Sequence, residues 1–254
     1  MDQLEAETRD GILAGARKLG ITPDDILLIH SSFKSLGQTA LSPHQIVETF
    51  SSSVLPHGTA LYPTLTGSAG CSPENPPEFD ARTTPCWTGA IPSAALKHPN
   101  AVRSLNLTHS VTGIGDRADM ICRNHQLAET PCGAGSPFDA LIRLGGKVLL
   151  IGCDYESVTL LHHVEEIAGV EYHMIPGHSI SPAVDWDGVT HTVRQRYHRY
   201  GAARAFHKLQ PYLERAEAVT TGSILRASCT LIDAQDLAEI ALALLRSDPA
   251  FLLA

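Results

Sequence analysis

Apolar positions along the chain alternate between short continuous runs and the periodicity of a helix face. Continuous apolar runs occupy residues 26–29, 59–63 and 147–152, which is typical of strands buried on both faces. Helical spacing covers most of the intervening chain, at residues 3–18, 43–54, 91–98, 116–127, 138–144, 159–167, 197–213 and 233–245. Strands that alternate with helices predict an α/β fold with a largely parallel central sheet flanked by helices.

One stretch departs from this alternation. Residues 168–193 are β-like and interrupted by Pro and Gly, which predicts a small β-rich insertion there. Residues 64–87 form a long Gly-, Pro- and Ser-rich loop, and loops of that length are usually functional. No repeat, charge block or linker divides the chain. We therefore expect a single domain over residues 1–254, with a subdomain at roughly 168–213.

Two segments offer the groups of an acid–base site. Residues 103–111 place His109 between two hydroxyl side chains, just before what reads as a turn containing Gly113 and Gly115. Residues 159–166 follow the clearest strand and supply Glu165. A histidine base needs a carboxylate to orient it, and these segments could supply one each. The alternative is that His109 is a satisfied, buried histidine with no chemical role.

The end of the first predicted strand carries a second candidate site. Residues 31–37 hold three serines and Lys34, at the kind of strand end where α/β proteins collect ligands. Backbone N–H groups, hydroxyls and one lysine could cradle a phosphate or a pantetheine group. Neither a GxGxxG nor a GxxxxGK[ST] motif is present, so a solvated serine-rich loop stays open as the alternative.

Composition narrows the classes of function. The 254 residues are 43% hydrophobic and 18% charged, and the net charge of −8 argues against a nucleic-acid partner. No apolar run reaches about 18 residues, so we expect no membrane span. The acidic, polar start, residues 1–7, is unlike a signal peptide. Six cysteines without CxxC spacing read as reduced thiols, and together these features predict a cytoplasmic protein.

Thirteen histidines raise the question of a metal. The adjacent pair His162-His163 and the loosely spread remainder match neither HExxH nor finger spacing, so no metal is expected. A metal-dependent hydrolase that uses His109, His162, His163 and Glu165 nevertheless stays open as an alternative.

Seven segments in order carry a resemblance to a known family. They are LIHSSFKSLG (28–37), FDARTTP (79–85), GAIP (89–92), RSLNLTHSV (103–111), TPCGAGSPF (130–138), VLLIG (148–152) and TLLHHVE (159–165). The chain resembles the aminoglycoside 3-N-acetyltransferase family over nearly its whole length. This resemblance implies an α/β fold distinct from that of the GNAT acetyltransferases, and acetyl-CoA as co-substrate.

The resemblance also implies roles for single residues. His109 would be the general base and Glu165 its helper. Three further side chains, Asn106, His162 and Glu166, would bind the acceptor. The coenzyme A site would be lined by Ser31, Ser32, Lys34, Ser35, Thr84 and Ser110.

The activity implied is acetyl transfer from acetyl-CoA to a small, cationic amine. The expected acceptor is the 3-amino group of a deoxystreptamine aminoglycoside, and its acetylation would confer antibiotic resistance. A homodimer is a possible assembly. Asn106 in place of the family's usual histidine, Trp87 and the basic segment 205–210 favour another amine, in secondary metabolism. A catalytically silent coenzyme A-binding protein is a further alternative.

Overall fold

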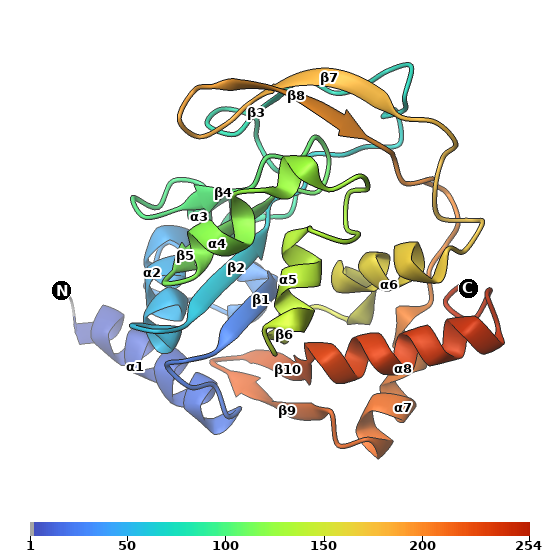
Figure 1. Cartoon of the computed structure of the whole chain (residues 1–254). Helices are drawn as coiled ribbons and strands as arrows, with labels where there is room; N and C mark the ends of the chain where they lie inside the picture. Colours follow the sequence, from blue (N-terminus) through green and yellow to red (C-terminus); the bar gives the residue numbers. More distant parts are fainter. Residues whose placement is uncertain (1–2) are drawn as a thin grey trace.

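A seven-stranded sheet runs through the middle of the molecule in the computed structural model, which describes residues 3–254 (Figure 1). The sheet is ordered β4-β5-β2-β1-β6-β10-β9. Its strands are β1 (Ile26–Ser31), β2 (Thr59–Pro63), β4 (Val102–Arg103), β5 (Val111–Gly115), β6 (Lys147–Ile151), β9 (Val219–Ile224) and β10 (Ala227–Asp233). Met1 and Asp2 of the acidic N-terminal segment lie outside the described residues.

The sheet is mixed, with its parallel part at the centre. β1 pairs parallel with both β2 and β6, as the continuous apolar runs predicted. The pairs β2–β5, β4–β5, β6–β10 and β9–β10 are antiparallel. The prediction of a largely parallel sheet therefore holds for the buried centre, while the pairs on both sides are antiparallel; β9 and β10 on one side form a hairpin with a short direct connection.

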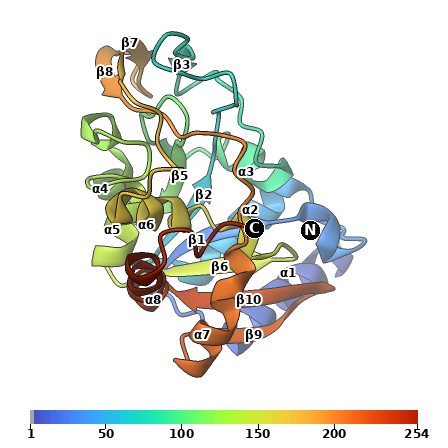
Figure 2. The same ribbon diagram turned by 90° about the vertical axis from the view of Figure 1, so that its right-hand side faces the viewer.

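Helices cover both faces of the sheet (Figure 2). On one face α1 (Gln3–Lys18), α2 (Pro43–Val54) and α3 (Ala90–Ala95) pack on Leu27 and Ile29 of β1. The opposite side of β1, with Ile26 and Leu28, belongs to a second core shared with the remaining helices. These are α4 (Ala118–Cys122), α5 (Pro137–Arg143), α6 (Leu160–Ala168), α7 (Gln210–Arg215) and α8 (Ala234–Ser247). Because successive strand residues point to opposite faces, a continuous apolar strand builds both cores at once.

Local sequence signals fix where two of these helices begin. Ser42 caps α2 through a reciprocal capping box with Gln45, and Pro43 occupies the first turn. Ser136 caps α5 by accepting a hydrogen bond from the backbone N–H of Asp139. The glycine-rich segment 132–137 therefore serves as a helix entry.

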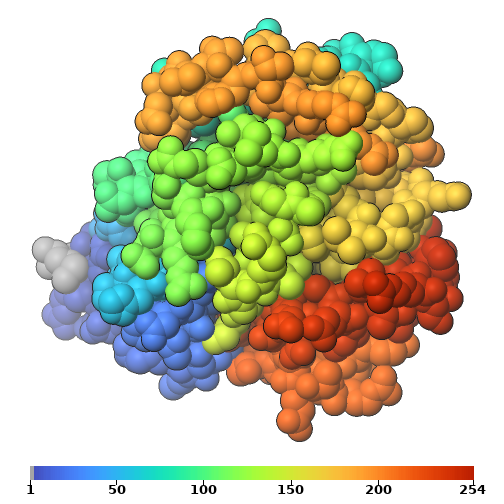
Figure 3. Space-filling view, viewed as in Figure 1, coloured from blue at the N-terminus to red at the C-terminus, as the bar shows by residue number. Residues whose placement is uncertain are grey.

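A small three-stranded sheet forms a separate layer at one end of the molecule. It contains β3 (Phe79–Asp80), β7 (Ser179–Val184) and β8 (Thr190–Gln195), and its β7–β8 hairpin forms a ridge at the top of Figure 3. The β-rich insertion predicted near residues 168–193 is therefore present, with its hairpin ending slightly later. β3 comes from the long loop 64–87, so loop and insertion meet here.

Three local predictions differ from the structure. Gly113 and Gly115 lie within β5 rather than in a turn, and a Cβ on Gly113 would come 2.9 Å from the Cβ of Ala118. The helix predicted at 116–127 is divided into α4 and the 3-10 turn η2 (His125–Leu127). The helix predicted at 197–213 begins only with η4 (Phe206–Leu209) and α7. Residues 197–205 instead lie outside helices and strands, and Arg204 among them contacts Glu165.

The cysteines and the apolar character of the helices bear on two further predictions. All six cysteines are free, as their spacing predicted. None of the helices within residues 3–254 combines the length and the apolar character that a membrane crossing requires.

Candidate active site

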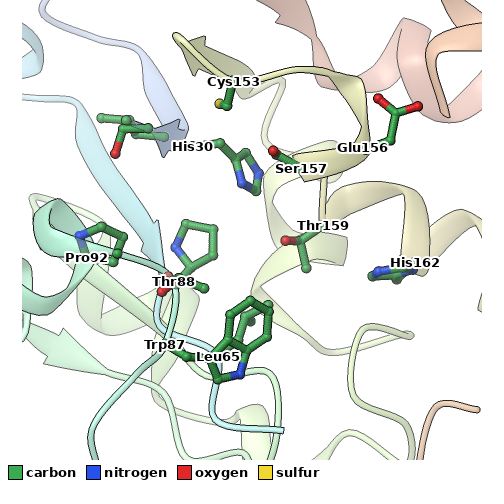
Figure 4. Close-up of a pocket in the computed structure, with 14 residues that line it drawn as sticks. His30, Leu65, Trp87, Thr88, Pro92, Cys153, Glu156, Ser157, Thr159 and His162 are labelled. Carbon is green, nitrogen blue, oxygen red and sulfur yellow. Dashed lines mark hydrogen bonds between the residues drawn. The ribbon is translucent and has the colours of Figure 1, made fainter. Parts of the chain in front are cut away.

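Two adjoining cavities open where β1 and β2 end. The first, here the strand-end cavity, has a volume of about 430 Å³ and lies between the end of β1, the loop 64–88 and the start of α6 (Figure 4). Its lining includes His30, Ser31, Trp87, Thr159 and His162. This is the strand-end position at which ligands of α/β proteins are expected.

The second cavity is smaller and rich in imidazole. It has a volume of about 170 Å³ and is here called the histidine cavity, because His109, His162, His173 and His198 line it. It shares three residues with the strand-end cavity, and His162 is one of them. A ligand in either cavity would therefore reach the same imidazole.

His162 is held by a local helical pair. It lies in the first turn of α6, and its Nδ1 is 2.8 Å from Oε2 of Glu165 three residues later. Residues at i and i+3 share a helix face, so this contact needs no long-range arrangement. The His162 side chain is 26% exposed, whereas that of Glu165 is fully buried. The carboxylate therefore holds the ring from the protein interior, and the ring faces both cavities.

Glu165 is the centre of a buried ionic network. Besides His162, its carboxylate contacts Nδ1 of His173 at 3.1 Å and accepts a hydrogen bond from Nε of Arg204 at 2.7 Å. Burial raises the pKa of this carboxyl group, but the hydrogen bond from His162 and the charges of His162, His173 and Arg204 outweigh it, so the pKa falls to about 2. Glu165 is therefore ionised at neutral pH.

The expected contact between Glu165 and His109 is not formed. Nδ1 of His109 lies 2.9 Å from the hydroxyl of Thr108, and its ring meets that of His198 with centroids 4.4 Å apart. The His109 side chain is only 4% exposed, and burial lowers its pKa well below the ordinary value, with His162 adding to the effect. The carboxylate of Glu165, which was expected to orient His109, pairs instead with His162 on the same helix.

Asn106 supports the loop that carries His109. The Asn106 side chain is 1% exposed, and its Oδ1 accepts hydrogen bonds from the backbone N–H groups of Thr108 and His109. This is the local side-chain to backbone pattern that shapes Asx turns. Asn106, expected to bind the acceptor, is absent from the lining of both cavities.

Glu166 and His163 point away from the cavities. Oε1 of Glu166 lies 2.6 Å from Nε2 of His198 and accepts a hydrogen bond from the backbone N–H of Cys132. Burial raises the pKa of Glu166 to about 7. Nδ1 of His163 is 2.7 Å from the carbonyl oxygen of Cys132. Glu166, expected to bind the acceptor, thus braces the wall behind the histidine cavity.

Only part of the serine-rich segment reaches the strand-end cavity. Ser31 lines it, and no described group hydrogen-bonds the buried Ser31 hydroxyl. Ser32, Lys34 and Ser35 fall in or next to the 3-10 turn η1 (Phe33–Leu36), outside the lining. The hydroxyl of Ser35 donates to the carbonyl oxygen of Ser32, which closes that turn.

The other two residues expected to line the coenzyme A site belong to a buried clamp around Arg103. Nε of Arg103 donates to the hydroxyl of Ser110 at 3.0 Å, and its terminal nitrogens donate to carbonyl oxygens of Thr64, Ala81 and Thr84. Burial lowers the pKa of Arg103 to about 10. Thr84 and Ser110 therefore help tie the loop 64–88 to β4, and neither lines the strand-end cavity.

Sequence reasoning missed four residues that the fold brings to the site. These are His30, His173, His198 and Arg204. His30 lies in β1 with an unpartnered, buried Nε2, and burial lowers its pKa to about 3. The other three lie in irregular chain, where no periodicity marks which side chain points inward. They lie outside α6, so no helical spacing relates them to Glu165.

The family of this chain follows from its similarity to known proteins. A family model described as aminoglycoside 3-N-acetyltransferase matches residues 28–246. The chain belongs to this family. A match over most of the chain agrees with the seven ordered segments of the sequence. It gives no support to a metal-dependent hydrolase.

Individual relatives agree with this membership. Aminoglycoside N(3)-acetyltransferase III of Salmonella sp is 30% identical over 177 residues, which cover 64% of this chain and 62% of the relative. The chain thus matches less than two thirds of that relative's length. Aminoglycoside N(3)-acetyltransferase IV of Salmonella sp is 28% identical over 91% of this chain and 84% of its own.

Solved structures share the fold. The AAC-IIIb binary structure with CoASH superposes with a TM-score of 0.79 at 25% identity, covering 94% of this chain and 96% of its own. A mutant of aminoglycoside acetyltransferase AAC(3)-IVa in complex with a gentamicin gives 0.80 at 26% identity, covering 100% of this chain and 92% of its own.

Proposed function

We propose that this protein transfers an acetyl group from acetyl-CoA to the amine of a small acceptor, with His162 as general base. One observation carries the proposal. His162 lines both cavities, while its Nδ1 is held by the buried carboxylate of Glu165. A base that faces two substrate cavities from their common wall can act on the atoms that meet there.

The chemistry follows from the orientation of the ring. Nδ1–H of His162 donates to Glu165, so the lone pair is on Nε2 and is available to take a proton. The acceptor nitrogen attacks the thioester carbonyl carbon, and Nε2 of His162 removes its proton as the C–N bond forms. Collapse of the tetrahedral intermediate breaks the C–S bond, and the leaving coenzyme A thiolate takes the proton from Nε2 of His162. No acyl-enzyme is required.

The strand-end cavity suits the acyl donor. Its volume of about 430 Å³ lies within the range of small-molecule sites, and it combines apolar walls with a few polar groups such as His30 and Ser31. The relative solved as a binary complex with CoASH supports coenzyme A as the donor carrier. We therefore assign the pantetheine arm to this cavity.

The acceptor proposed first is the 3-amino group of a deoxystreptamine aminoglycoside. The names of the relatives and the complex of one of them with a gentamicin support this choice. Acetylation would remove a positive charge from the drug and so give resistance.

A second candidate is the same reaction on a different amine. The histidine cavity is lined by Arg199 and Arg204, and no Asp or Glu is among its described lining residues. Arg204 is paired with the buried Glu165, but the charge of Arg199 would disfavour a polycationic sugar there and would attract an amine that also carries an anionic group. This observation favours the alternative that the basic segment 205–210 suggested.

Alanine variants of His162 and His109 test which histidine is the general base. We expect His162→Ala to lower kcat by about 10²- to 10⁴-fold, the usual worth of a general base. His109→Ala should lower kcat less, because the buried His109 ring shapes the wall of the histidine cavity and does not take the proton. Free-thiol release from acetyl-CoA measures both, and His57→Ala, an exposed histidine, is the control. Near wild-type turnover in His162→Ala, with loss in His109→Ala, would return the base role to His109.

The same assay separates the two acceptors. Thiol release with deoxystreptamine drugs but not with anionic amines supports the first candidate, and the reverse pattern supports the second. Coenzyme A binding without release on either panel would indicate a silent binding protein.

A further inference from the structure

We propose that a divalent transition-metal ion of the Zn²⁺ class binds between His109, Cys132 and His198. One ligand atom from each of these buried side chains lies within 4.8 Å of the other two. Acetyl transfer as proposed above uses no metal. The metal site is argued from these three side chains alone, and its test measures metal binding and not turnover, although His109 and His198 also line the cavity proposed for the acceptor.

The donor set suits a borderline metal. One thiolate sulfur and two imidazole nitrogens are common ligands of Zn²⁺, with bonds of about 2.0–2.3 Å. Tetrahedral geometry then places ligand atoms about 3.3–3.6 Å apart, so the three side chains would move together by roughly 1 Å. Since His109 and His198 line the histidine cavity, the fourth position of the ion would face it, and the charge of Arg204 in that lining is balanced by Glu165.

Each imidazole ligand is oriented by a second group. Nε2 of His198 is 2.6 Å from Glu166, and Nδ1 of His109 is 2.9 Å from the hydroxyl of Thr108. One ring nitrogen of each histidine is thus held, and the other is left to coordinate. Metal-binding histidines characteristically have such partners. Oε1 of Glu166 also accepts a hydrogen bond from the backbone N–H of Cys132, so one carboxylate braces two of the three ligands.

A neighbouring histidine, His173, packs against the proposed ligands. His173 is 1% exposed, its ring lies 4.1 Å from that of His198, and its Nε2 has no hydrogen-bond partner among the described residues. Nδ1 of His173 lies 2.9 Å from a terminal nitrogen of Arg204, which can only donate, so Nε2 of His173 carries the ring proton. His173 therefore packs beside the proposed ion site and is not one of its ligands.

Metal binding would be coupled to a proton. The thiolate form of cysteine, not the thiol, is the ligand of a metal ion. Binding replaces the S–H bond of Cys132 by a sulfur–metal bond and releases one proton to solvent. Affinity should consequently weaken as pH falls.

Cobalt provides the direct test. The full-length protein, stripped of metal with EDTA and dialysed, is titrated with Co²⁺. We expect tetrahedral visible bands and a near-ultraviolet thiolate-to-cobalt charge-transfer band that saturates at one ion per chain and is abolished by Zn²⁺. Cys132→Ser should lose the charge-transfer band and weaken Co²⁺ binding at least tenfold. Cys122→Ser, which changes a buried cysteine outside the proposed site, is the matched control.

A second variant guards against misfolding. His198→Gln retains the thiol, so it should keep a charge-transfer band but bind Co²⁺ at least tenfold more weakly, while near-ultraviolet circular dichroism checks the fold of each variant. The absence of a charge-transfer band in the wild-type protein would overturn the proposal. A band that survives in Cys132→Ser would also overturn it, because the sulfur would then come from another cysteine such as Cys153. Neither result bears on thiol release from acetyl-CoA.

Discussion

At the scale of single residues, the types of side chain were predictable and their pairing was not. The sequence indicated that histidines and a glutamate would form the site, but it paired Glu165 with His109 across 56 residues of chain. In the structure Glu165 contacts His162, which is on the same helix face. A contact at i, i+3 forms with the helix itself, whereas a contact between two loops depends on the whole fold.

Removal of the Glu165 charge should reduce both stability and rate. Glu165→Gln leaves the guanidinium of Arg204, whose side chain is 13% exposed, without its ionic partner, so we expect a loss of about 3 kcal/mol in the free energy of unfolding. The rate should fall because the amide holds the His162 ring less firmly. Urea denaturation and thiol release measure the two effects.

A surface pair serves as the control for Glu165. Glu129 contacts Arg194 with both side chains more than half exposed, so Glu129→Gln should change stability by no more than about 0.5 kcal/mol. Equal stability losses in the two variants would show that the network around Glu165 has no special role.

At the scale of elements, burial on both faces decided what could be predicted. β1, β2 and β6 are apolar throughout and were predicted, as were the long helices with a clear apolar face. β9 and β5 were missed because β9 is mostly exposed and β5 contains two glycines. An exposed strand that pairs on one side needs no continuous apolar run, so its sequence resembles a loop.

The loop 64–88 depends on a clamp that the sequence did not reveal. Arg103 donates to three carbonyl oxygens of this loop from a 4% exposed side chain, and Trp87 and Thr88 near its end line the strand-end cavity. Arg103→Lys keeps the charge but loses the planar fork, so several carbonyl groups lose their donor. We expect a loss of about 2 kcal/mol in stability and a higher KM for acetyl-CoA.

The control for this clamp lies in the same loop. Arg82 pairs with Asp80 on the surface, and Arg82→Lys should change the unfolding free energy and the KM very little. Limited proteolysis should cut the loop faster in Arg103→Lys than in Arg82→Lys. Similar cutting rates would mean that Arg103 does not hold the loop.

At the scale of the whole molecule, the histidines come together only through the fold. His109, His162, His173 and His198 span 90 residues, and their rings lie 4.1–6.2 Å apart in the pairs that touch. The ordered segments of the sequence identified the family and its architecture. They could not reveal this cluster, because three of its four members, His109, His173 and His198, lie outside helices and strands, where no periodicity places them.

Burial of neutral histidines makes a pH-dependent prediction for the molecule. Burial lowers the pKa of His30 and His173 to about 3 and that of His125 to about 4, and it also lowers the pKa values of His109 and His198. Above pH 6.5 these rings are neutral in both states. As pH falls below 6.5 the unfolded chain binds protons that the folded chain does not, so stability decreases.

The size of this effect predicts acid unfolding at a mild pH. Each such group contributes up to about 1.4 kcal/mol per pH unit, so five could remove about 7 kcal/mol per unit, comparable with the whole stability of a typical domain. We expect unfolding near pH 5, above the range in which Glu165 is protonated. Urea titrations between pH 8 and 5, in EDTA, measure the slope. His125→Gln should reduce the slope by the amount that corresponds to one proton, whereas His57→Gln should leave it unchanged. A stability that does not change down to pH 5 would show that the buried rings take up protons in the folded state.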